Sequence, residues 1–180
     1  KKKAGTSPFV LDSLKREITT LEDEIAQTEK KIREHIRNHP SLKEDVNLLT
    51  SVKGVGTTTA AAWLAYLGDV RRFDDPRELV AYLGLVPVQK QSGTSLNGKP
   101  HISHKGLKRL RKALYFPITG AATNYNPFFK AIYDRLVKKG KAGKVAVIAC
   151  MRKLVHVLYG ILRTRTPFDL AVAQGVRSQV

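Results

Sequence analysis

The sequence predicts a mainly α-helical protein, with a long N-terminal coiled-coil helix followed by a compact helical domain that contains a helix-hairpin-helix-like motif. Apolar residues recur at heptad spacing through residues 11–36, and later segments carry apolar residues at helical spacing. Alternating patterns typical of strands are scarce. With 180 residues, 42% of them hydrophobic, the chain is long enough for one domain and an appendage.

The N-terminal heptads predict a coiled-coil oligomerisation helix over residues 11–39, after a flexible leader of residues 1–10. Thr28 and His35 weaken the second half of the seam, and Pro40 ends the helix. An apolar seam needs a second helix, and we expect a homo-oligomer (a dimer or a tetramer) or a helix from outside this sequence. The seam residues are Leu11, Leu14, Ile18, Leu21, Ile25 and Ile32.

Residues 46–67 resemble a helix-hairpin-helix, because two short apolar helices flank the turn Gly54-Val55-Gly56. Two glycines allow a tight turn that leaves the first N–H groups of the second helix facing outward, where they and the helix dipole suit a phosphate. Thr57 is the expected N-cap, with Thr58 beside it. The alternative is a tight turn between helices with no ligand.

Further helices are expected to complete a domain over residues 45–165. Pro76 opens a helix that ends near residue 84, and others cover residues 107–115, 118–123, 127–139 and 144–162, with a break at Pro117. Residues 85–100 have no helical period and are expected to be an irregular, functional or mobile segment. Residues 166–180 are expected to form an irregular tail.

The positive charge is concentrated in the second half of the chain. The formal net charge is +17, and residues 79–180 hold 18 basic residues against two acidic ones, Asp134 and Asp169. One-sided charge of this size calls for a polyanionic partner, so we expect nucleic acid and no membrane. The sequence opens without Met, so we expect a piece of a larger protein, located in the cytoplasm of a bacterium near the nucleoid.

Several chemistries are not expected in this sequence. A single cysteine, Cys150, excludes a disulfide framework, and the five histidines lack metal-ligand spacing. The late acidic residues Asp69, Asp74, Asp75 and Glu78 have the positions of turn and helix-start residues rather than of metal ligands. We therefore predict no metal site and no cofactor within this sequence.

A serine nucleophile is the chemistry that remains open. Ser92 precedes a glycine in the irregular segment, and Ser95 and Ser103 follow it. A serine hydroxyl that attacks a DNA phosphodiester needs cations to stabilise the transition state and a group that takes its proton. His101 and His104 are candidates for that group, and the alternative is that Ser92 is an ordinary loop serine.

The order of several motifs resembles a known domain. Ser51-Val52-Lys53-Gly54-Val55-Gly56 is followed by Leu79-Val80-Ala81-Tyr82-Leu83-Gly84-Leu85-Val86-Pro87, by Gln91-Ser92-Gly93 and by Gly98-Lys99-Pro100-His101-Ile102-Ser103-His104-Lys105-Gly106. Together they resemble the C-terminal transposase domain of DEDD-type bacterial insertion-sequence transposases, which are related to the Piv DNA invertases. The heptad segment is similar to the coiled coil that precedes this domain in the family.

The resemblance implies a two-part active site. A RuvC-like N-terminal domain, missing from this sequence, carries the carboxylates and binds Mg²⁺, and the present domain supplies Ser92, with Ser95 and Ser103 as alternatives. The partners implied are donor DNA, target DNA and a structured guide (bridge) RNA. We expect nucleic-acid contacts from Lys53, Gly54, Gly56, Thr57, Thr58, Lys90, Lys99, His104, Lys105, Lys108, Arg109, Arg111, Lys112, Lys144, Arg152 and Lys153.

Three hypotheses follow from the sequence. In the first, the chain is the serine-bearing half of a DNA recombinase and is inactive by itself. In the second, it is a non-catalytic DNA- and RNA-binding module that dimerises, so that only its charges matter. In the third, the coiled coil is a scaffold and the charge is incidental.

Overall fold

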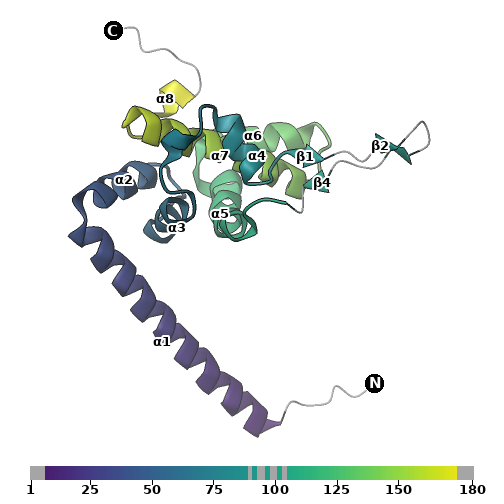
Figure 1. The fold of residues 1–180 in the computed structure, drawn as a ribbon. Helices are drawn as coiled ribbons and strands as arrows, with labels where there is room; N and C mark the ends of the chain where they lie inside the picture. The colour runs from purple at the N-terminus through teal and green to yellow at the C-terminus, as the bar shows by residue number, and fades with distance from the viewer. Residues whose placement is uncertain (1–6, 89–90, 93–95, 98–100, 103–104, 174–180) are drawn as a thin grey trace. The chain divides into compact units, whose positions relative to one another are not determined.

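A computed structural model describes residues 7–88, 91–92, 96–97, 101–102 and 105–173 (Figure 1). The chain divides into two compact units, residues 1–40 and 41–180. The described part is mainly helical, as the sequence predicts.

The first unit is dominated by the 31-residue helix α1 (Pro8–Asn38). Proline at the first turn opens the helix, because it has no N–H to leave unpaired there, so the expected flexible leader of residues 1–10 is wrong at residues 8–10. The heptad face is open in the single chain, and Leu11, Ile18 and Ile25 are 46%, 54% and 59% exposed. The existence of this helix is confirmed, whereas its pairing as a coiled coil stays a prediction.

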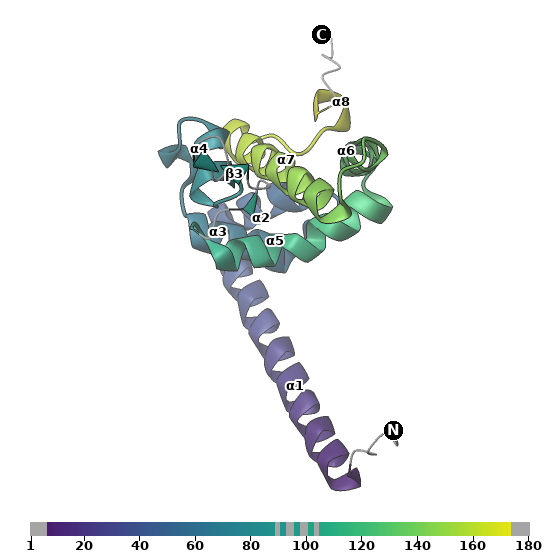
Figure 2. The ribbon, with the colours of Figure 1, turned by 90° about the vertical axis from the view of Figure 1, so that its right-hand side faces the viewer.

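The second unit is built around α7 (Gly143–Thr164), which agrees with the helix expected over residues 144–162. Its buried face includes Met151, Leu154 and Leu158, and it packs against α4, α5 and α6 (Figure 2). Within the described residues, α7 is also the one helix long and apolar enough to cross a membrane, and 56% of its most apolar window is buried in the fold. Such burial is typical of the core helix of a globular domain.

Shorter helices surround α7. They are α2 (Pro40–Thr50), α3 (Thr57–Leu67), η1 (Val70–Arg72), α4 (Pro76–Tyr82), α5 (Lys108–Gly120), η2 (Ala121–Tyr125), α6 (Pro127–Lys138) and α8 (Leu170–Ala173). The start of α4 at Pro76 is confirmed. The short helix α8 lies in the tail that was expected to be irregular, and the side chain of Asp169 accepts the Ala171 N–H at its start.

The segment expected to be irregular contains short antiparallel strands. β1 (Pro87–Val88) pairs with β4 (His101–Ile102), and β2 (Gln91–Ser92) pairs with β3 (Leu96–Asn97). We call β1–β4 the serine hairpin, and it extends away from the helices of its unit (Figure 1). Strands of two residues are too short to show an alternating pattern, which explains why the sequence did not predict them.

The predicted break at Pro117 is wrong, because α5 continues through this proline to Gly120 and then into the π-helical turn η2. Proline removes one backbone hydrogen bond from a helix interior. Burial on both sides outweighs that loss, since Leu114 and Ile118 are almost fully buried. The hydroxyls of Thr119 and Thr123 also donate to carbonyls four residues earlier, at Tyr115 and Thr119.

Candidate nucleic-acid interface

The proposed nucleophile lies in the serine hairpin. Ser92 is the second residue of β2, and its backbone pairs with Leu96. Ser95, Ser103, Lys90, Lys99 and His104, which were also predicted to act at the site, lie outside the described residues.

A groove lies between strands β1 and β4 of the serine hairpin and helix α7. Pro87 of β1 and Ile102 of β4 lie on one side, and Lys144 and Arg152 of α7 lie on the other, around a volume of about 300 Å³. We call this the α7 groove. The rest of its lining is apolar and consists of Leu85, Val145, Ile148 and Ala149. Two predicted nucleic-acid residues are therefore brought beside the hairpin that carries Ser92, although they are far from it in sequence.

Lys153 has a different environment from its neighbour Arg152. Its ammonium group lies 5.6 Å from the centre of the Phe128 ring on α6, at a distance that allows a cation–π contact. Lys153 does not line the α7 groove, and the structure places it against α6 instead.

The exposed side of α5 carries three cations. Lys108, Arg109 and Lys112 are exposed, and we call them the α5 basic face. Phe116, one turn after Lys112, is 76% exposed. The sequence analysis missed Phe116, although its i,i+4 spacing from Lys112 places it on the same side of the helix.

Arg111 differs from these three cations. Its Nη1 donates to the carbonyl oxygen of Leu83 at 2.6 Å and to that of Lys105 at 2.8 Å. The guanidinium is therefore held by the backbone of its own chain. Arg111 was predicted as a nucleic-acid contact, and the structure gives it an internal role.

The turn between α2 and α3 serves first to pack the domain. Gly54 has φ = +110°, and a Cβ there would lie 2.8 Å from the Cβ of Ala121. Val55 is buried, and Asn126 donates through Nδ2 to the Lys53 carbonyl at 2.8 Å. This close packing accounts for Gly54 without any ligand.

The start of α3 remains open to a ligand. The N-cap is Gly56 rather than the predicted Thr57, and no side chain caps the helix. Thr57 and Thr58 are exposed. Lys53 is exposed as well, and these groups together could contact a phosphate. Phosphate binding at this helix start stays a prediction.

The late acidic residues act as turn and helix-start residues, as predicted. Asp69 and Asp75 accept the N–H groups of Arg71 and Arg77 through Oδ1, at 2.9 and 2.6 Å. Among the described residues, no group of three or more His, Cys, Asp or Glu side chains is arranged to hold a metal ion.

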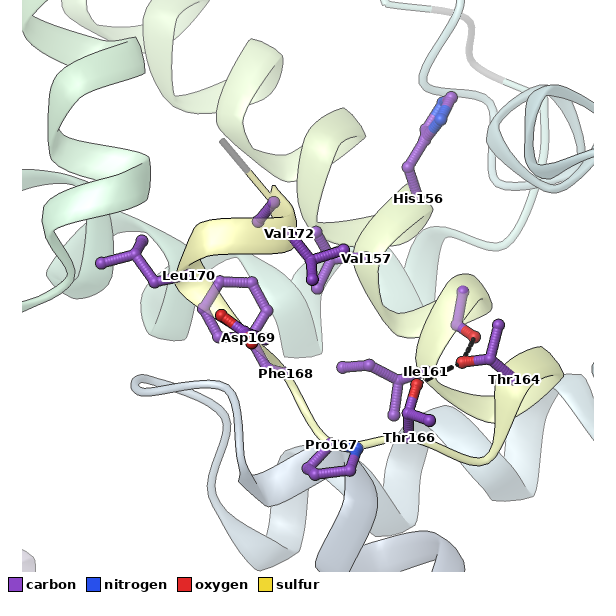
Figure 3. Close-up of a pocket in the computed structure, with 12 residues that line it drawn as sticks. His156, Val157, Ile161, Thr164, Thr166, Pro167, Phe168, Asp169, Leu170 and Val172 are labelled. Atoms are coloured by element: carbon purple, nitrogen blue, oxygen red, sulfur yellow. Dashed lines mark hydrogen bonds between the residues drawn. The ribbon is translucent and has the colours of Figure 1, made fainter. Parts of the chain in front are cut away.

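Another cavity lies between the second half of α7 and the segment that leads into α8 (Figure 3). It has a volume of about 760 Å³, and Val157, Ile161, Phe168 and Leu170 make its lining largely apolar. Burial, followed by the charge of Lys153, lowers the pKa of His156 at its edge.

Cys150 is buried in α7 and does not line this cavity. Burial raises the pKa of its thiol to about 11, so the thiol is protonated at neutral pH.

Comparison with known proteins agrees with the expected family. A sequence model described as the transposase IS116/IS110/IS902 family matches residues 46–134. The pilin gene-inverting protein of Moraxella bovis is 35% identical over 147 residues, covering 82% of this chain and 46% of the relative. An IS110 insertion-element protein of Streptomyces coelicolor is 32% identical over 172 residues, covering 96% of this chain and 41% of the relative.

A probable family 20 transposase of Pseudomonas aeruginosa is 31% identical over 160 residues, covering 87% of this chain and 46% of the relative. The chain thus spans less than half the length of each of these three relatives. The matched region contains α3, α4, the serine hairpin and α5, and it ends within α6. The chain therefore carries a transposase domain of the IS116/IS110/IS902 family, related to the pilin gene-inverting proteins.

Proposed function

We propose that this chain is part of a DNA transposase or recombinase, in which it binds nucleic acid and supplies Ser92 as the nucleophile for strand cleavage. The observation that carries the proposal is the α7 groove, because Lys144 and Arg152 line it next to the hairpin that contains Ser92. The relatives are named as transposases and gene-inverting proteins, which supports DNA as the substrate.

In the proposed step, the Ser92 oxygen forms a bond to a DNA phosphorus atom and the bond from that phosphorus to a sugar oxygen breaks. The serine proton passes to a base, and the departing sugar oxygen takes up a proton. Lys144 and Arg152, which line the groove beside β1 and β4, bind phosphates of the same DNA strand. A Mg²⁺ ion held by a separate carboxylate domain would supply further charge stabilisation.

We assign the other contacts to the sugar–phosphate backbone of the nucleic acid rather than to its bases. The α5 basic face and the start of α3 present cations and N–H groups, which suit phosphate oxygens and do not read sequence. Pairing with a guide RNA is proposed to supply sequence specificity instead. These contacts would operate in the bacterial cytoplasm, where the nucleoid lies.

The test uses the full-length protein with labelled DNA, guide RNA and Mg²⁺, quenched in denaturant and analysed by mass spectrometry. The expected result is a DNA adduct on the peptide that contains Ser92, which is lost in Ser92→Ala and retained in Ser95→Ala and Ser103→Ala. Recombination by Ser92→Ala with unchanged adduct would remove Ser92 from the role. Recombination without an adduct on any serine would favour the non-catalytic binding module.

We further propose that α1 joins copies of the protein through its heptad face. The double substitution Ile18→Asp with Ile25→Asp places two carboxylates in the seam and is expected to convert the oligomer to monomers. Thr20→Asp with Gln27→Asp introduces the same charge, at the same seven-residue spacing, outside the seam. Sedimentation equilibrium should show loss of the oligomer in the first variant alone, and an oligomer that persists there would contradict the proposal.

A further inference from the structure

The two chain segments that enter and leave the serine hairpin meet in direct backbone contact. We call Leu83, Gly84, Lys105 and Gly106 the hairpin base. Gly84 and Gly106 have φ = +70° and +90°. A Cβ on Gly84 would lie 2.1 Å from the Lys105 oxygen, and one on Gly106 would lie 2.6 Å from the Gly84 nitrogen. Only glycine fits at these two positions.

Arg111 connects the two sides of the hairpin base. Its Nη1 donates to Leu83 on the entering segment and to Lys105 on the leaving segment. Both acceptors are neutral carbonyls, and residues 79–133 contain no carboxylate. Because both hydrogen bonds leave from Nη1, this one group holds the two segments at a fixed separation.

The hairpin base is anchored on one side by the core. Leu83 and Leu85 are fully buried, and Leu85 donates its N–H to the Val80 carbonyl at the end of α4. Gly84 bonds in the same way to Ala81. Arg111 belongs to the first turns of α5, so its hydrogen bonds tie α4, α5 and the return segment of the hairpin to one another.

We infer that Arg111 is a positioning residue for the serine hairpin, which sets where Ser92 lies relative to the α7 groove. This inference rests on the proposed role of Ser92. Ser92 follows Gly84 by eight residues, a span of at most about 29 Å. A tilt of about 10° at the base would move its far end by up to about 5 Å over that span. A displacement of about 1 Å is enough to cost roughly 100-fold in rate.

The rate test replaces Arg111 by Met in the full-length protein. Arg111→Met is expected to lower the single-turnover rate of Ser92 adduct formation by on the order of 100-fold. The control is Arg135→Met, which removes the same group from an exposed position on α6. Arg111→Lys should restore the net charge but not the rate, because the shorter lysine side chain does not place a donor where Nη1 contacts both carbonyls.

A second measurement follows the hairpin itself and does not depend on activity. In a Cys150→Ala background, spin labels on Asn97→Cys in β3 and Lys43→Cys in α2 report the distance between the hairpin and the helices. Arg111→Met should broaden this distribution, whereas Arg135→Met should leave it unchanged. If Arg111→Met loses helical content, the distance distribution of Arg111→Lys is compared with that of Arg135→Met instead.

The two measurements separate this inference from the proposed function. A broadened distribution in Arg111→Met, with no serine adduct even in the wild type, would support positioning by Arg111 and contradict the role of Ser92. A wild-type adduct whose rate and distance distribution are unchanged in both Arg111 variants would overturn the positioning role alone. An equal loss of rate in Arg111→Met and Arg135→Met would show that Arg111 acts through its charge alone. That result would also overturn the positioning role.

Discussion

Replacing Lys108 and Lys112 by glutamate is expected to weaken nucleic-acid binding by at least about tenfold at low salt. Both lysines are exposed one turn apart on the α5 basic face. Phosphate contacts release counterions when they form, so each lost lysine contact should reduce the slope of log K against log salt by about one. The double variant should therefore bind with a slope shallower by about two, as measured by fluorescence anisotropy between 50 and 200 mM salt.

A control with the same change in net charge separates local contacts from overall attraction. Arg135→Glu with Lys138→Glu reverses two exposed cations on α6, outside the predicted interface. Long-range attraction is reduced equally in both variants, but the phosphate contacts of α5 are removed in the first alone. Equal affinities and equal salt slopes in the two double variants would contradict the assignment of the α5 basic face.

The helices with the strongest local patterns could be predicted from the sequence. The helix starts at Pro8 and Pro40 were not predicted, but Pro76 stands in the first turn of a helix as predicted, and the predicted apolar face of α7 repeats over six turns. These signals are local, since each involves residues within one or two turns of each other. The break at Pro117 was predicted by the same kind of reasoning and was wrong, because long-range burial outweighed the local cost.

The site could be predicted only in part, because its key relations are long-range. Composition identifies Arg111 and Lys144 equally as cations in a basic region. Their different environments depend on partners that are distant in sequence, since Arg111 binds a carbonyl 28 residues earlier and Lys144 faces Pro87 across the α7 groove. The glycines of the hairpin base likewise reveal their purpose only once Gly84 and Gly106 are seen in contact.

Asn126 is a further residue whose importance the sequence shows only in part. Its place before Pro127 is typical of a helix N-cap, and its Oδ1 accepts the Phe128 N–H at 3.1 Å at the start of α6. The sequence gives no sign of its second contact, the 2.8 Å hydrogen bond from Nδ2 to the Lys53 carbonyl. Asn126 is 2% exposed. A backbone group that loses its hydrogen bond to this side chain therefore has no bulk water to replace it, and the loss lowers the free energy of unfolding.

Asn126→Ala is expected to destabilise the domain by roughly 2–4 kcal/mol, because about 1 kcal/mol comes from the lost cap and about 1–3 kcal/mol from the unpaired Lys53 carbonyl. For a domain of this size the melting temperature should fall by roughly 5–15 °C. Asn126→Ser retains a capping oxygen but does not reach Lys53, so it isolates the second contribution. Asn124→Ala, at an exposed position two residues earlier, should stay within about 0.5 kcal/mol of the wild type.

Chemical denaturation of the four proteins decides whether the Asn126 side chain joins the α2–α3 turn to α6. If Asn126→Ser is as stable as the wild type, the bond to Lys53 contributes nothing, and the turn is held by the packing of Gly54 on Ala121 alone. If Asn126→Ser loses stability but keeps the helical content of α6, the turn and the helix are linked through this one amide. In that case the start of α3 is fixed relative to α6 by the same link, and Asn126→Ser should also weaken any phosphate contact made there, at unchanged net charge.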